Sequence, residues 1–269
     1  MKKLLCVLVN LLNLNVALAA AAPVLTAVTQ PFLYEIQKNG ETAYMLGTMH
    51  LDIPLESFPA YVTDKLAAAK TVIIETNLDD AEKLATGAFM FGATTPLNQL
   101  LTQPQWDRLV AAFATKGIPE VQLVRAFPGQ IMQQYIQIQL NNPSFRATTP
   151  PILDTYVLGY AKDNGKDLDY MEAAQVQIDI LKYTMEDATM LREVLDLDTK
   201  GKLYGWMLKM NADQTKLMKD MNTAYYAGDL LSLESLTTSG MDATMKNMFL
   251  NQRNHAWVAS FNRITAKPG

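Results

Sequence analysis

The sequence predicts an α/β (α+β) protein in which a small central sheet is joined to a large helical portion. Short β-type runs occupy the first third of the chain and return once at 168–171, whereas apolar residues beyond Leu97 recur mostly with helical spacing. The chain has 269 residues, of which 49% are apolar and 19% charged. This length and composition are typical of a globular protein with a substantial core.

The predicted strands begin with a hairpin. Residues 32–36 and 43–46 form its two strands, and the Asn-Gly pair at 39–40 forms its turn, because both residues tolerate positive φ angles. The next strand, 72–74, is a continuous apolar run that ends at Glu75, which is typical of a strand buried on both faces.

Capping signals and apolar stripes predict the helices. Thr102, with Gln105 three residues later, forms a capping-box pattern, and Gly117 ends the helix that it starts. The later helices are rich in methionine, which is expected to fill the core. The expected helices are 60–69, Thr102 to Gly117, 121–140 with a break at Pro128 left open, Leu153 to "DNGK", 174–196, 202–227 and 241–264.

The first 22 residues predict a secretory signal peptide. "MKK" supplies a positive start, "LLCVLVNLLNLNVAL" an apolar stretch, and "ALAA" the small residues of a cleavage site near Ala19–Ala22. The apolar stretch is too short for a membrane span on its own, although an uncleaved membrane anchor is the alternative. We therefore expect a signal peptide at 1–22, a single domain at 23–269, and a periplasmic or secreted bacterial protein without a stable membrane span after cleavage.

Charge and cysteine content exclude several classes of protein. The net charge is −4 and no basic patch stands out, so nucleic acid is not an expected partner. Cys6 lies in the predicted signal peptide, and no other cysteine occurs in the sequence. Disulfides, zinc–thiolate sites and cysteine nucleophiles are therefore excluded from the mature domain, and the absence of G-x-S-x-G argues against a serine triad.

His50 and Glu75 are the first candidates for a functional site. His50 follows strand 43–46 in "GTMH", where Gly47 would let the backbone turn tightly, and a neutral imidazole can ligate a metal or act as a base. Glu75 follows strand 72–74, so the two side chains are expected to share one rim of the sheet and to bind a divalent ion. The alternatives are a structural histidine at a turn and a glutamate that caps a helix or faces solvent.

Two more carboxylates come into consideration. Glu172 follows strand 168–171 just as Glu75 follows its own strand, so it could reach the same edge of the sheet. A structural role is the alternative for Glu172. Asp154 opens a predicted helix, and there the default role of an acidic residue is capping.

The segment "NQRNHAW" holds the candidate cation. Arg253 and Trp257 are four residues apart on a predicted helix, so they share one face of it. Arg253 could clamp a carboxylate or a phosphate through two parallel hydrogen bonds. His255 points away from that face and is expected to lie in solvent.

Seven segments, in this order and spacing, resemble the TraB/GumN (TraB/PrgY/GumN, Tiki-like) family over nearly the whole mature chain. They are "YMLGTMH" with the Pro loop behind it, "VIIETN", "LNQLLTQPQWDRL", "GIPEVQLVRAFPGQIM", "ILDTYVLGYAKDNGKDLDYMEAAQVQ", "YYAGDLLSLESL" and "NQRNHAW". The resemblance implies an α/β fold of the kind shared with erythromycin-esterase-like and haem-uptake ChaN-like proteins. It also implies a metal-dependent hydrolase or protease site.

The resemblance assigns site residues by position. His50 matches the G-x-x-H histidine, Glu75 the strand-end glutamate, Glu172 the glutamate of the family's "LE" strand, and Arg253 with Asn254 an Arg-Asn pair. The family pattern continues into a strand and a second G-x-x-H, whereas this sequence stops at "ITAKPG" and contains no second G-x-x-H. The resemblance therefore predicts a C-terminally incomplete domain with one metal ligand fewer, which weakens metal affinity.

Two main functional hypotheses follow. In the first, an exported hydrolase of peptides binds Mn²⁺, Co²⁺ or Zn²⁺ at His50 and Glu75. Glu75 or Glu172 acts as general base on a water held by the ion, and Arg253 stabilises developing negative charge. In the second, the same scaffold is a non-catalytic periplasmic module that binds a peptide or protein through Arg253. A third reading is a structural fragment whose sheet a partner chain completes.

Overall fold

The computed structural model describes residues 27–38, 40–88, 91–140 and 151–264. The predicted signal peptide therefore lies outside the described residues. None of the described helices combines the length and the hydropathy that a membrane span requires.

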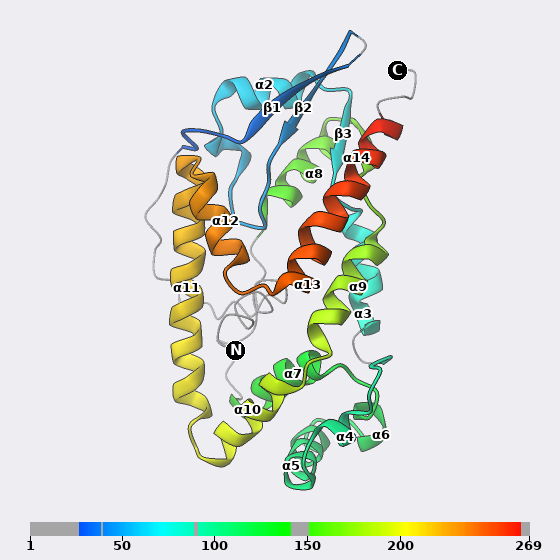
Figure 1. Cartoon of the computed structure of the whole chain (residues 1–269), viewed down its shortest axis with the longest axis vertical. Helices are drawn as coiled ribbons and strands as arrows, with labels where there is room; N and C mark the ends of the chain where they lie inside the picture. Colours follow the sequence, from blue (N-terminus) through cyan, green and yellow to red (C-terminus); the bar gives the residue numbers. More distant parts are fainter. Residues whose placement is uncertain (1–26, 39, 89–90, 141–150, 265–269) are drawn as a thin grey trace.

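The predicted α+β class with a large helical portion is confirmed (Figure 1). The strands form two two-stranded sheets. Strand β1 (Leu33–Lys38) pairs antiparallel with β2 (Glu41–Leu46), as the Asn-Gly signal predicted, and Gly40 of that turn has a φ of 84°. Asn39 lies outside the described residues. Strand β3 (Thr71–Ile74) pairs in parallel with β4 (Asp167–Tyr170).

The expectation that the ends of β2 and β3 share one rim of a sheet is wrong. Among the described residues, β2 pairs only with β1 and β3 only with β4, so the two strands belong to different sheets. Strand β3 is also short, and its burial alternates rather than being complete on both faces. The apolar run at 72–74 therefore marks a strand without specifying its neighbour.

The helices follow the sequence pattern with several extra breaks. They are η1 (Leu55–Ser57), α2 (Ala60–Ala68), α3 (Leu78–Ala88), α4 (Leu97–Leu100), α5 (Gln103–Ala114), α6 (Glu120–Leu123), α7 (Pro128–Leu140), α8 (Leu153–Asp163), α9 (Ala174–Met185), α10 (Thr189–Thr199), α11 (Leu203–Ala227), α12 (Leu230–Thr238), α13 (Ala243–Lys246) and α14 (Arg253–Ile264). A π-helical turn, Asn247–Gln252, joins α13 to α14. Such turns inside helices occur frequently at functional sites.

Local hydrogen bonds explain where helices start and break. The capping box of α5 is present, with the Thr102 amide donating to Gln105 Oε1 at 3.1 Å. The segment expected as one helix over 174–196 divides into α9 and α10. There the Asp187 side chain accepts from the Thr189 amide at 2.8 Å, which favours a turn over a continued helix. Pro128 begins α7 and separates it from α6.

Helix α11 connects the two ends of the molecule (Figure 1). Its N-terminal part packs into a helical core with α4, α5, α7 and α10, in which Leu109, Phe113 and Tyr135 are fully buried. Its C-terminal part packs into a second core below the hairpin, around Leu153 and Tyr225. A smaller cluster under β3 and β4 packs against α8. The candidate site lies between these last two clusters.

Gly228 generates a prediction about stability, because both its positive φ and the close approach of Gln30 require a glycine there. It has a φ of 70°, and an added Cβ would lie 2.5 Å from both the Cβ and the carbonyl oxygen of Gln30. Gly201 has a similar φ of 65° but open space around it. We expect Gly201→Ala to cost about 1 kcal/mol of unfolding free energy through the left-handed backbone alone. Gly228→Ala should cost about 3 kcal/mol, because steric overlap adds to that strain.

Urea denaturation of the two variants beside the wild type measures this difference. Equal losses in the two variants would show that the segment around Gln30 does not pack against the end of α11.

Candidate functional site

The parallel strand pair sets two glutamates side by side. The register of β3 and β4 pairs Ile74 with Tyr170, and the pairing continues past the strands, where the Glu172 amide donates to the Glu75 carbonyl at 2.9 Å. Both carboxylates therefore leave the same end of this sheet, because parallel strands end at a common edge. The structure thus brings together the two strand-end glutamates that the sequence singled out.

Arg253, at the start of α14, bridges the two glutamates. Its Nη2 lies 2.8 Å from Glu75 Oε2 and 2.6 Å from Glu172 Oε1, and its Nε donates to both Glu172 oxygens at 3.1 Å. Trp257 lies on the same helix face, as predicted, with its ring 4.7 Å from the guanidinium carbon and its Nε1 donating to Glu172 at 2.9 Å. His255 is exposed, also as predicted.

Burial and charge act in opposite directions on Arg253. Burial lowers the pKa of its guanidinium, but hydrogen bonds and charge from Glu172 and Glu75 outweigh that effect and raise the pKa above its ordinary value. The arginine is therefore a permanent cation at the centre of this cluster.

The two glutamates differ in exposure and in how many of their carboxylate oxygens already accept hydrogen bonds. The Glu172 side chain is only 5% exposed, and its oxygens accept from Arg253, from Trp257 and from Gln177 Nε2 at 3.1 Å. The Glu75 side chain is 28% exposed, and its Oε2 accepts from Arg253 and, at 3.5 Å, from Gln177. Its Oε1 accepts no hydrogen bond from the described residues. Glu75 is thus the member of the pair that can act on another molecule.

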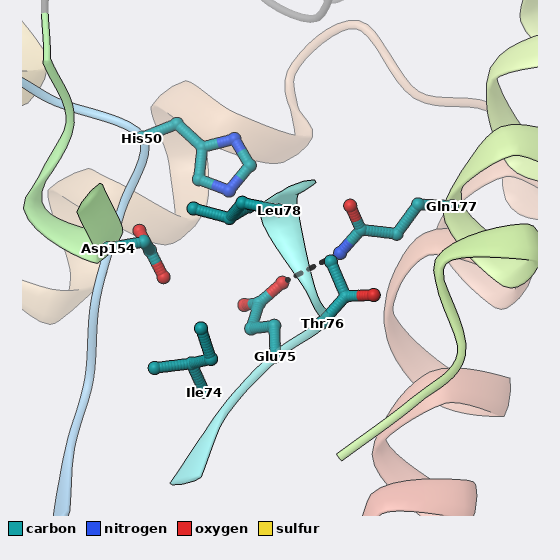
Figure 2. Close-up of a pocket in the computed structure, with 7 residues that line it drawn as sticks. All are labelled: His50, Ile74, Glu75, Thr76, Leu78, Asp154 and Gln177. Carbon is teal, nitrogen blue, oxygen red and sulfur yellow. Dashed lines mark hydrogen bonds between the residues drawn. The ribbon is translucent and has the colours of Figure 1, made fainter. Parts of the chain in front are cut away.

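Glu75 faces a small pocket that also holds His50 (Figure 2). The pocket has room for a water-sized occupant and is lined by His50, Ile74, Glu75, Thr76, Leu78, Asp154 and Gln177. His50 comes from the loop after β2, Glu75 follows β3, and Asp154 lies in the first turn of α8. His50 and Glu75 therefore share a pocket although their strands belong to different sheets.

Packing holds the loop that carries His50. The Gly47 amide donates to the Phe32 carbonyl at 2.8 Å, and the hydroxyl of the buried Tyr225 donates to the Gly47 carbonyl at 2.6 Å. A Cβ on Gly47 would lie 3.0 Å from Phe32 Cβ. Gly47 is thus needed for this close approach, whereas the sequence suggested a tight turn. His50 itself is exposed beyond this anchored segment.

Asp154 lines the pocket, although the sequence assigned it only a capping role by default. The expectation of a capping role is wrong, because the N-cap of α8 is Ile152 and Asp154 lies inside the first turn. Asp154 is 6% exposed, its Oδ1 accepts from Thr48 Oγ1 at 3.1 Å, and its buried Oδ2 has no hydrogen-bond partner among the described residues. An acidic residue at this position commonly offsets the helix dipole in solvent, so nothing local marks it as buried.

The surroundings of the pocket carry more negative than positive charge. Among the described residues, Glu75 and Asp154 line the pocket and Glu172 lies beside Glu75, whereas Arg253 pairs with the two glutamates and not with Asp154. Burial raises the pKa of Glu75 above its ordinary value of 4.5; the charge of Asp154 adds to this, while Arg253 and His50 oppose it. Such a site favours a cation.

The donor types of the pocket suit a divalent ion, but their spacing does not complete a cage. Imidazole and carboxylate, as in His50, Glu75 and Asp154, are common ligands of Mn²⁺, Co²⁺ and Zn²⁺. Within the described ranges, no three His, Cys, Asp or Glu side chains form a group that could hold a metal ion. The pocket therefore suits a divalent ion that keeps water molecules in the coordination positions that the protein does not fill.

Arg253 generates a prediction about stability. Arg253→Met leaves Glu172 enclosed with no counter-charge, so the free energy of unfolding should fall by about 3–5 kcal/mol. Lys216→Met is the control, since Lys216 pairs with Asp220 at an exposed position and should cost at most about 1 kcal/mol. Urea denaturation measures both, and similar losses would mean that the Arg253 cluster is no more than a surface ion pair.

Glu75 generates a prediction about pH. A folded-state pKa above 4.5 means that the folded protein holds this proton more tightly than the unfolded chain does. Wild-type stability relative to Glu75→Gln should therefore decline as pH rises from about 4.5 to the raised pKa, and then level off. Urea denaturation between pH 4 and pH 8 in the presence of EDTA tests this, and a difference that grows with pH would contradict it.

Comparison with known proteins agrees with the resemblance read from the sequence. A family model described as the TraB/PrgY/gumN family matches residues 32–269. No curated protein and no solved structure gives a match. The matched range includes both strand-end glutamates, His50 and Arg253. The chain therefore belongs to the TraB/PrgY/gumN family.

Proposed function

We propose that this protein is an exported hydrolase that cleaves peptides with the help of a divalent cation held at His50 and Glu75. The observation that carries the proposal is the convergence of these two side chains on one small pocket in negatively charged surroundings. Membership of the TraB/PrgY/gumN family supports it.

The pocket suits a cation in size as well as in charge. It has room for a water-sized occupant, which matches a single ion and is too small for a peptide side chain. The carboxylates and the incomplete set of protein ligands favour a hard ion that retains water. Mn²⁺ fits this description best among the three ions considered.

The chemistry divides between the ion and the protein. When bound, the ion would polarise the scissile carbonyl and lower the pKa of a water. Glu75 takes the proton of the attacking water, because its Oε1 is free of hydrogen bonds from the described residues and its raised pKa brings it closer to neutral pH. Arg253 holds the other Glu75 oxygen, at 2.8 Å, and so fixes the direction of the carboxylate.

The geometry favours positioning roles for Arg253 and Glu172. In the sequence-based hypothesis, Arg253 stabilises developing negative charge on the substrate. In the structure, however, its Nε and Nη2 donate hydrogen bonds to the two glutamates. Glu172 was a candidate base, yet both its oxygens accept hydrogen bonds inside the protein. We propose that Glu172, with Trp257, holds Arg253, which in turn aims Glu75 at the pocket.

Export is part of the proposal and rests on the signal-like residues 1–22. A periplasmic or secreted protein would meet peptides outside the cytoplasm. N-terminal sequencing of the protein recovered from a bacterial periplasm should find a start between Ala20 and Pro23.

The alternative is a module that binds a peptide or protein without cleaving it. It is favoured by the lack of a three-ligand group among the described residues, whereas the internal pairing of Arg253 with Glu172 argues against Arg253 as its anchor. Under this alternative, peptides would bind equally well in EDTA and would remain intact.

Calorimetric titration tests the proposal. Mn²⁺, Co²⁺ and Zn²⁺ are titrated into the purified chain and into His50→Ala, Glu75→Gln and, as control, His255→Ala, whose exposed imidazole lies on α14. We expect binding of one ion that weakens at least about tenfold in the first two variants and is unchanged in the control. EDTA should also abolish cleavage of a peptide library. Absent binding, or binding that neither site variant alters, would leave the binding module as the better account.

A further inference from the structure

The position of Asp154 requires a partner that the surrounding side chains do not provide. Asp154 is 94% buried, since only 6% is exposed, and it lines the same pocket as His50 and Glu75. The Oδ1 of Asp154 accepts a hydrogen bond from Thr48 Oγ1, and its Oδ2 has no hydrogen-bond partner in the described part of the chain. A buried carboxylate is unfavourable unless it is paired, hydrogen-bonded or bound to a metal ion.

No nearby cation among the described side chains neutralises this carboxylate. Arg253 is the guanidinium of the site, and it pairs with Glu75 and Glu172. In Figure 2 the Asp154 carboxylate lies beside the pocket, on the side opposite Gln177, with the His50 ring and the Glu75 carboxylate facing the same space. A cation that neutralises the Asp154 carboxylate would therefore lie in the pocket itself.

The proposed chemistry also calls for a second carboxylate. Glu75 has only one oxygen, Oε1, that the described residues leave free, because Oε2 is held by Arg253. That single oxygen would have to contact the ion and also accept the proton of a water. A second acidic ligand eases this conflict, because the ion is then held by Asp154 and His50 as well, while Glu75 Oε1 accepts the proton.

We propose that Asp154 is a ligand of a divalent cation in this pocket, through Oδ2, and that the ion's affinity depends on Asp154 at least as much as on His50. The described side chains do not form a three-ligand group, so water completes the coordination of the ion. The inference rests on the proposed function, since it concerns the same ion. His50 is exposed on its loop, whereas Asp154 is enclosed by the fold, so the buried carboxylate is the better anchored of the two donors.

Three variants separate a ligand role from a structural one. Asp154→Asn keeps the shape and the Thr48 hydrogen bond but removes the charge. Thr48→Val removes that hydrogen bond and keeps the carboxylate. Asp52→Asn is the control, because Asp52 lies in the same loop region as His50 but pairs with the Tyr156 hydroxyl, at 2.8 Å, outside the pocket.

The first readout is Mn²⁺ affinity by calorimetry. We expect Asp154→Asn to weaken Mn²⁺ binding by about a hundredfold, Thr48→Val by about tenfold, because Thr48 only orients the carboxylate, and Asp52→Asn by less than about threefold. Unchanged binding in Asp154→Asn would overturn the inference. Equal losses in Asp154→Asn and Thr48→Val would also overturn it, since Asp154 would then act only by holding the loop.

The second readout is thermal stability, which does not depend on activity. In EDTA, Asp154→Asn should melt at the same temperature as the wild type or higher, because a buried unpaired charge has been removed. Excess Mn²⁺ should then raise the melting temperature of the wild type by more than that of Asp154→Asn. A variant that melts far lower in EDTA would make Asp154 a structural residue. If the wild type itself binds no ion, the proposed function fails, and that result is distinct from a failure at Asp154 alone.

Discussion

The ion cluster of Arg253 with Glu75 and Glu172 is the interaction on which the candidate site depends. It joins the ends of β3 and β4 to the start of α14, and it crosses 178 residues of sequence between Glu75 and Arg253. Glu172 is enclosed, so its charge requires the guanidinium, and the guanidinium in turn fixes one oxygen of Glu75. One arginine therefore stabilises the fold and sets the direction of the carboxylate that faces the pocket.

Two further constraints complete the geometry around this cluster. Tyr225 of α11 holds the Gly47 carbonyl and so anchors the loop that brings His50 over from the hairpin. The π-helical turn Asn247–Gln252 immediately precedes Arg253, where the buried Phe249 packs with Ile180 of α9. The pocket thus draws on the end of β3, on the loop after β2 and on helices α3, α8 and α9.

The balance of charge connects this structure to its proposed chemistry. A single guanidinium cannot neutralise three carboxylates, and it is already committed to two of them. The third, Asp154, lines the small pocket, and its Oδ2 accepts no hydrogen bond from the described residues. A divalent cation would balance this excess, whereas a neutral ligand would leave Asp154 buried and unpaired. A cation in the pocket would therefore stabilise the fold as well as take part in the proposed catalysis.

Features that depend on neighbouring residues were predictable from the sequence alone. The Asn-Gly pair predicted the hairpin, and Thr102 with Gln105 predicted the start of α5. The strand-end positions of Glu75 and Glu172 predicted that both lie at one edge of a sheet. The spacing of Arg253 and Trp257 predicted that they share one face of a helix. The tertiary structure alone decided that β2 and β3 lie in different sheets, that Arg253 is paired inside the protein, and that Asp154 faces the pocket. Asp154 meets Thr48 across 106 residues, and no local pattern encodes such a contact. Local structure follows from backbone preferences and short-range hydrogen bonds, whereas the partner of a buried charge is set by how distant elements pack.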